Sequence, residues 1–154
     1  MDKGNIFKGV YSQVTGEKFD KSDKKKCQML QNIIFLLGER GKFIDDYKFV
    51  PDESGVFSQR LENDIDAMGE TEEAVDFDKD TVEKILLLRD VYLEAIDKYS
   101  KDEWMASIAA AVYMKKYMYP SYSWLKLEDY IYAFANNVVR EDFAGLICQS
   151  RRFI

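Results

Sequence analysis

Apolar residues recur at spacings of three and four along most of this chain, and only two prolines interrupt it. That spacing places side chains on one face of a helix, whereas strand-rich folds need frequent turns. The clearest case lies in residues 22–39, where the apolar positions are Cys27, Leu30, Ile33, Ile34 and Leu37. We therefore predict a mainly α fold, a compact bundle of about six helices with at most a small β element.

The chain has the length of one domain, and we predict a single helical domain over residues 1–154. Helices are expected at residues 22–39, 56–68, 80–99 and 100–117, with another ending at 136–137 and a short last one before 151–152. Asp80 with Glu83, and Ser100 with Glu103, are typical of capping boxes. Residues 42–50 favour an extended segment, residues 1–20 an irregular or short helical lead-in with three glycines, and residues 69–79 an acidic internal loop.

Histidine is absent, which removes the commonest general base and the commonest metal ligand. We predict a protein that is not an enzyme, with no catalytic residues, no cofactor and no metal site. Carboxylate-only, Mg²⁺-dependent hydrolysis is the remaining enzymatic alternative, although no ligand spacing supports it. Cys27 and Cys148 are expected to be free, buried thiols.

The charge and hydropathy of the chain constrain its surroundings. No run of about 18 apolar residues is present, and the first residues do not resemble a signal peptide, so we expect a cytoplasmic protein with no membrane partner. A net charge of −6 disfavours direct nucleic-acid binding unless basic residues gather locally. The candidates for such a patch are Lys24, Lys25 and Lys26, or the pair Arg151 and Arg152.

Three segments together resemble the YwgA-like and Panacea domain family, which includes the SocA-like antitoxin. They are CQMLQNIIFLLGERG at 27–41, FVPDESGVFSQRLENDID at 49–66 and EWMASIAAAVYM at 103–114. Val56 replaces the family's proline, and Asp52 to Ser54 replace the aromatic residue before its glycine. The resemblance implies a helical core of winged-helix-like character, found in phages and mobile elements, whose members act as antitoxins or adaptors.

Two groups of residues are candidates for partner binding. The first is the turn at Phe57, Ser58 and Arg60, with Ser58 exposed; a helix cap with a buried Phe57 is the favoured alternative. The second is Tyr119, Tyr122 and Trp124 around Pro120, because Tyr and Trp dominate binding hot spots. The acidic segment is interpreted as a solvated loop, with phosphate mimicry left open.

We expect a non-catalytic inhibitor or antitoxin-like protein of phage or mobile-element origin. It would use an acidic and aromatic surface to block a protein partner, such as a toxin or a host-defence nuclease of the CRISPR type. The alternative is a winged-helix-like DNA-binding transcriptional regulator. The sequence leaves open whether the chain acts alone or as a homodimer.

Overall fold

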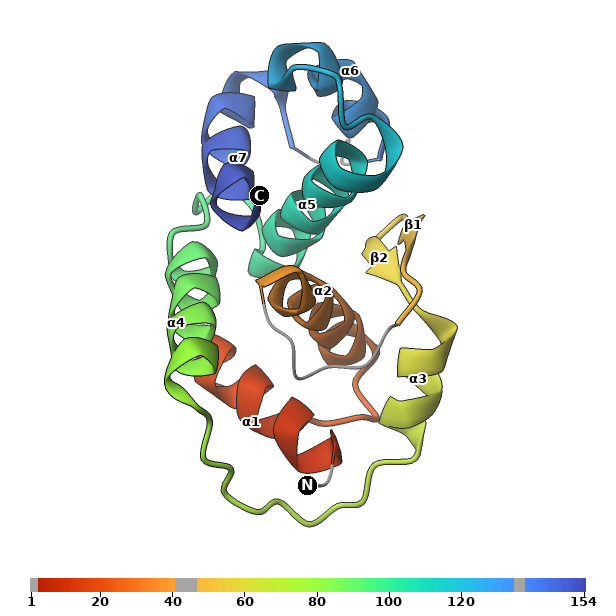
Figure 1. The fold of residues 1–154 in the computed structure, drawn as a ribbon, viewed down its shortest axis with the longest axis vertical. Coiled ribbons are helices and arrows are strands. Elements are labelled where there is room, and N and C mark those ends of the chain that lie inside the picture. Colours follow the sequence, from red (N-terminus) through yellow and green to blue (C-terminus); the bar gives the residue numbers. More distant parts are fainter. Residues whose placement is uncertain (1–2, 41–46, 135–137) are drawn as a thin grey trace.

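The computed structural model describes residues 3–40, 47–134 and 138–154 (Figure 1). Within these ranges the chain forms seven α-helices and one two-stranded hairpin, which confirms the predicted mainly α fold with a small β element. The helices are α1 (Lys3–Thr15), α2 (Lys24–Arg40), α3 (Gln59–Asp66), α4 (Lys79–Leu93), α5 (Lys101–Tyr113), α6 (Trp124–Phe134) and α7 (Phe143–Ser150). The strands are β1 (Val50–Asp52) and β2 (Gly55–Phe57), and the single turns are η1 (Met114–Met118), η2 (Arg140–Asp142) and η3 (Arg151–Phe153).

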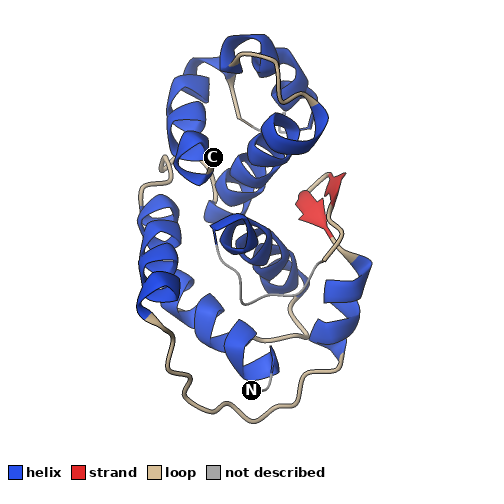
Figure 2. Ribbon diagram, viewed as in Figure 1, coloured by secondary structure: helices blue, strands red, loops and turns tan. Residues whose placement is uncertain are grey.

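Two helices, α2 and α5, pack against each other in the middle of the molecule, and the remaining helices surround them (Figure 2). Every residue of α2 from Met29 to Leu37 is buried. On α5, residues 104–112 are buried except for Ala106, which is half-buried. Helices that are enclosed all round belong to a protein core, and the alanines of α5 permit close packing. The hairpin lies beside both central helices.

Residues 3–15 are helical, so of the two alternatives for residues 1–20 the helical lead-in describes them and the irregular one is wrong there. Phe7, Val10 and Val14 are buried on one face of α1, which packs against α4. Gly9 suits the helix because the ring of Phe77 lies 3.3 Å from where its Cβ would stand. The helix stops at Gly16, which has a positive φ of 75°. The glycines favoured the irregular alternative, but tertiary packing overrides the low helix propensity of glycine here.

The segment predicted as a helix over residues 56–68 begins as a strand. β2 pairs antiparallel with β1, Val50 facing Phe57, and α3 starts only at Gln59. The predicted extended segment at 42–50 falls partly on residues 41–46, outside the described residues. Residues 47–49 have no regular structure and lead into β1.

The middle helices are shorter than predicted. α4 starts one residue before Asp80, capped by Asp78, and it ends at Leu93 rather than at residue 99. Ser100 caps α5 as expected, its Oγ accepting a hydrogen bond from the Glu103 amide. The α-helix then ends at Tyr113 and continues as the π-helical turn η1. The predicted end of α6 at 136–137 lies outside the described residues.

Both cysteines are free. Cys27 is buried, and burial raises the pKa of its thiol to about 11. Cys148 is exposed, contrary to the expected burial. Among the residues described here, no helix has both the length and the apolar character needed to cross a membrane.

Candidate partner-binding surface

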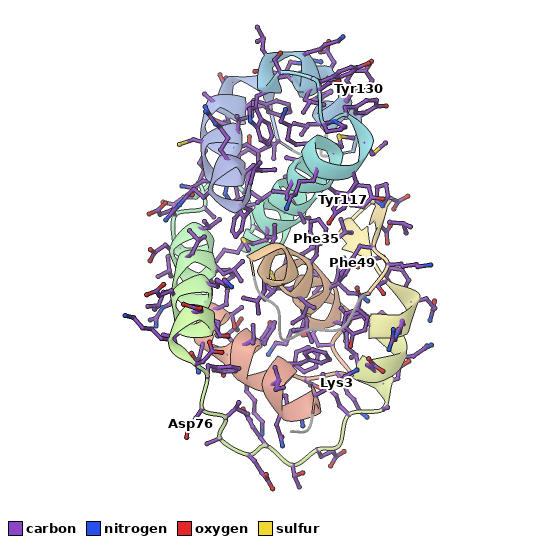
Figure 3. The ribbon with its side chains drawn as sticks, in the orientation of Figure 1. Lys3, Phe35, Phe49, Asp76, Tyr117 and Tyr130 are labelled. Carbon is purple, nitrogen blue, oxygen red and sulfur yellow. The ribbon has the colours of Figure 1, made fainter. Side chains whose placement is uncertain are left out.

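One end of the molecule carries a cluster of aromatic side chains on η1, α6 and the loop between them. Figure 3 shows Tyr130 at this end, with Tyr117 below it. We call this set the apical surface: Tyr117, Met118, Tyr119, Tyr122, Trp124, Leu125, Lys126 and Tyr130. It contains all three predicted residues of the second candidate group.

Three tyrosine rings hold the apical surface together. The centroids of Tyr119 and Tyr122 are 4.8 Å apart with an interplanar angle of 13°, a stacked pair. Tyr130 packs against both, at 4.7 Å from Tyr119 and 5.8 Å from Tyr122. Its pKa is raised, first by its electrostatic interaction with Tyr122 and then by burial. The loop residues and α6 thus form one aromatic unit.

The π-helical turn η1 gives the loop its direction. The Tyr119 amide donates to the Met114 carbonyl at 2.8 Å, a bond that spans five residues. The Lys115 ammonium donates to the carbonyls of Pro120 and Tyr122, at 3.1 and 2.6 Å. Single π turns inside helices are rare and frequent at functional sites. Here the turn and the lysine fix a loop that displays tyrosines.

The apical surface exposes large apolar side chains. The exposed fraction is 78% for Leu125 and 57% for Tyr117, and Met118 and Tyr130 are also exposed. Tyr119, Tyr122 and Trp124 are half-buried and pack against the core. Grouped apolar exposure of this kind marks interaction sites, and aromatic residues dominate binding hot spots.

Leu125 is the most exposed of the four apolar or aromatic apical residues that were not among the candidates from the sequence. It lies off the apolar stripe of α6, whose buried members are Leu127 and Ile131. A leucine on the polar side of an amphipathic helix was the available signal.

A row of rings links the apical surface to the hairpin. The ring of Phe35 lies 6.4 Å from Tyr117 and 5.2 Å from Phe49, the residue before β1. Figure 3 shows these three residues together on the hairpin side of the molecule. The apical surface is therefore supported from the core.

The first candidate group, Phe57, Ser58 and Arg60, does not form a comparable surface. Ser58 is 1% exposed, so its predicted exposure is wrong. Its Oγ caps α3 by accepting from the Leu61 amide. Phe57 is half-buried, and Arg60 is exposed with its guanidinium 5.8 Å from the Tyr47 ring. The favoured alternative, a helix cap, describes Ser58.

Amide side chains of α2 fasten this segment to the core. The Asn32 side chain donates to the Ser54 carbonyl and accepts from the Val56 amide, at 2.9 and 3.0 Å. Gln31 exchanges two bonds with the Ser58 backbone, at 3.1 and 3.0 Å. Gln28 donates to the Ser54 and Val56 carbonyls. The side chains of α2 therefore give β2 hydrogen-bond partners in addition to those that β1 provides.

The acidic segment lies at the opposite end of the molecule from the apical surface. Figure 3 shows Asp76 and Tyr130 at the two ends. Residues 69–78 contain no helix or strand, and their carboxylates are exposed. The Lys8 ammonium holds the segment by donating to the carbonyls of Gly69 and Thr71. The acidic and aromatic groups thus form two surfaces, not the single one predicted.

The predicted basic patches have acidic neighbours. Lys24 and Lys25 line a cleft of about 490 Å³ between α2, the hairpin turn and α5, together with Glu53, Asp102 and Glu103. Partial burial raises the pKa of Asp102, and Lys25 opposes that shift. Arg152 lies 3.4 Å from Glu94 and 3.9 Å from Asp90. Neither site offers an isolated cluster of cations to phosphate.

No metal-binding group of three or more His, Cys, Asp or Glu occurs among the described residues. No family model, curated protein or solved structure matches the chain. The site must therefore be interpreted from its own geometry.

Proposed function

We propose that this chain is a non-catalytic protein-binding inhibitor or antitoxin-like protein, and that the apical surface contacts its partner. The observation that carries the proposal is the exposed apolar side chain of Leu125 at the start of α6, directly after the loop in which Tyr119 and Tyr122 stack on each other. A rigid aromatic cluster loses little conformational entropy on binding, so it suits a stable complex. Inhibition would be steric.

The resemblance to the Panacea domain family supports the biological setting. We propose a cytoplasmic protein of a phage or mobile element, whose partner is a toxin or a host-defence nuclease of the CRISPR type. The segments that carry this resemblance are residues 27–41, 49–66 and 103–114, which include most of α2, the hairpin with α3, and most of α5. They support the fold, and the apical surface lies outside them.

The alternative DNA-binding regulator has less support. Its two candidate patches contain acidic neighbours, at Glu53 and Asp102 in one case and at Glu94 in the other. Phosphate binding would have to overcome this local repulsion as well as the net charge.

The test is an affinity capture from host lysate with two matched variants. Leu125→Asp places a charge on the apical surface, and Leu86→Asp places one on the exposed face of α4, where Leu86 is 49% exposed. We expect wild type and Leu86→Asp to retain one stoichiometric protein partner after nuclease treatment, and Leu125→Asp to lose it. A purified complex should then block the partner's activity.

Three results would contradict the proposal. One is a partner that Leu125→Asp retains, because the apical surface would then not be the contact. Another is a captured partner whose activity is unchanged in the complex. The third is recovery of nucleic acid alone, which would favour the DNA-binding alternative.

A further inference from the structure

We infer that the apical surface takes a polypeptide segment of the partner that combines apolar side chains with Asp or Glu. This inference rests on the proposed function and adds the chemistry of the partner. The inferred partner segment is acidic, whereas the net charge of −6 on the whole sequence would favour a basic partner.

The apical surface has the opposite local charge from the rest of the molecule. Residues 104–127 include no Asp or Glu, although the chain contains 28 of them, and they include three lysines. Lys126 is exposed, and Lys115 is bound by carbonyl oxygens that do not neutralise it. Two carboxylates follow on α6: Glu128 is half-buried, and Asp129 is paired with Arg140 at 2.5 Å, so cations remain in excess over residues 104–129. An approaching acidic segment would be attracted here.

The packing of the rings favours a polypeptide over single-stranded nucleic acid. Base stacking needs accessible ring faces. Tyr122 already contacts the stacked ring of Tyr119, and the Lys126 ammonium lies 3.9 Å from its centroid. The Lys115 ammonium lies 5.9 Å from the centroid of Trp124. The exposed groups of the apical surface are the aliphatic side chain of Leu125, the ring of Tyr117 and the ammonium of Lys126. These groups suit contact with amino-acid side chains of a partner.

These groups define the complementary segment. Leu125 and Tyr117 would be covered by apolar side chains, and Lys126 would pair with a carboxylate at the rim of the contact. Such a rim charge mainly changes the association rate and its salt dependence.

The experiment is a selection from a displayed library of random 15-residue peptides on the full-length protein. Parallel selections use Leu125→Asp, Lys126→Glu and the control Leu86→Asp. We expect peptides enriched on wild type and on Leu86→Asp to combine net negative charge with apolar residues, and to be absent from the Leu125→Asp selection. One such peptide should bind Lys126→Glu about fivefold more weakly, and should bind wild type more weakly as salt rises. Unchanged unfolding curves would show that the variants fold.

The outcomes separate this inference from the proposed function. Neutral or basic peptides that require Leu125 would overturn the acidic partner and leave the apical site standing. Binding of a 15-residue oligothymidine probe that competes with the peptides and is lost in Leu125→Asp would overturn the polypeptide class. Peptides that bind independently of Leu125, or no enrichment at all, would overturn the apical site and this inference together.

Discussion

Two segments with similar aromatic and hydroxyl residues have different surroundings in this molecule. The segment at 55–60 and the loop at 119–124 both appear from their residue types to be binding turns. In the first, backbone groups and the Ser58 hydroxyl are engaged by α2 and α3. In the second, Tyr119 and Tyr122 pack on each other and on Tyr130 and remain half-buried. Residue type alone therefore does not separate a structural turn from a contact surface.

The difference arises from what lies behind each segment. Behind β2 is the polar edge of α2. Its side chains Gln28, Gln31 and Asn32 bond to backbone groups of the segment at 54–58 that β1 does not pair. Buried backbone groups need such partners, so the segment is drawn inward. Behind the apical loop, Lys115 satisfies two carbonyls, and the loop rings pack against each other and the core while staying only half-buried. Substitutions should therefore destabilise the first segment and affect binding at the second.

The largest expected effect on stability is from Gly55→Ala. Gly55 has a φ of +113°, and an added Cβ would lie 2.3 Å from the Asn32 Oδ1 atom. Strain at this backbone conformation and the steric overlap should together lower the free energy of unfolding by about 3 kcal/mol. Urea unfolding measures the change.

Two variants control this experiment. Gly38→Ala should raise the free energy of unfolding by about 0.5 kcal/mol, because Gly38 lies in α2 with nothing within 4 Å of an added Cβ. Asn32→Ala combined with Gly55→Ala should cost less than the sum of the single changes, since the overlap is removed. Full additivity would show that the Asn32 contact is not the cause.

A smaller loss is expected from Gln31→Ala. The buried Gln31 side chain accepts from the Ser58 amide and donates to the Ser58 carbonyl. Its removal leaves the buried Ser58 amide unpaired, whereas the Ser58 carbonyl keeps the bond from the Glu62 amide. We expect about 2 kcal/mol of destabilisation by urea unfolding. Gln59→Ala is the matched control, because the Gln59 amide bonds only to the exposed Asn63 in the described contacts. An equal effect of both variants would contradict the role given to Gln31.

The core was predictable from the sequence because burial follows periodicity. The spacing of Leu30, Ile33 and Leu37 identifies the buried face of α2, and all three are fully buried. The Ser100 cap was also visible, since a serine followed by glutamate three residues later has a local physical meaning. Local signals of this kind need no knowledge of the rest of the chain.

The hairpin and the apical cluster could not be derived in the same way. The hydrogen bond between Gln31 and Ser58 joins residues 27 positions apart, and no local pattern around Ser58 predicts it. The packing of Tyr119 against Tyr130 depends on η1, and the residues MKKYM carry no pattern that predicts this π-helical turn. The tyrosines were identified as candidates from their type alone. The way in which their rings pack could be described only from the three-dimensional structure.

The apical surface should tolerate changes that the hairpin does not. Tyr122→Ala removes a stacked ring and a cation contact from a half-buried site, so we expect a loss of about 1 kcal/mol. Leu125→Ala should change the free energy of unfolding by less than about 0.5 kcal/mol, because its side chain is 78% exposed. Thermal and urea unfolding compare the two. A large loss in Leu125→Ala would mean that the leucine serves the fold.

The smallest expected effect is a pH dependence at the start of α4, which lies in neither segment and serves as the reference. The Asp78 carboxylate accepts from the Thr81 amide at 2.8 Å, and this bond lowers the pKa of Asp78 below its unfolded value of about 3.9. The ionised cap therefore stabilises the fold above about pH 4, and the contribution is lost as pH falls through the folded pKa. Asp78→Asn still caps the helix but does not titrate. Urea midpoints of wild type and Asp78→Asn should therefore converge on going from about pH 6 to about pH 3. The exposed Asp76→Asn variant controls for the change in net charge, and a constant difference between wild type and Asp78→Asn at both pH values would refute the ionised cap.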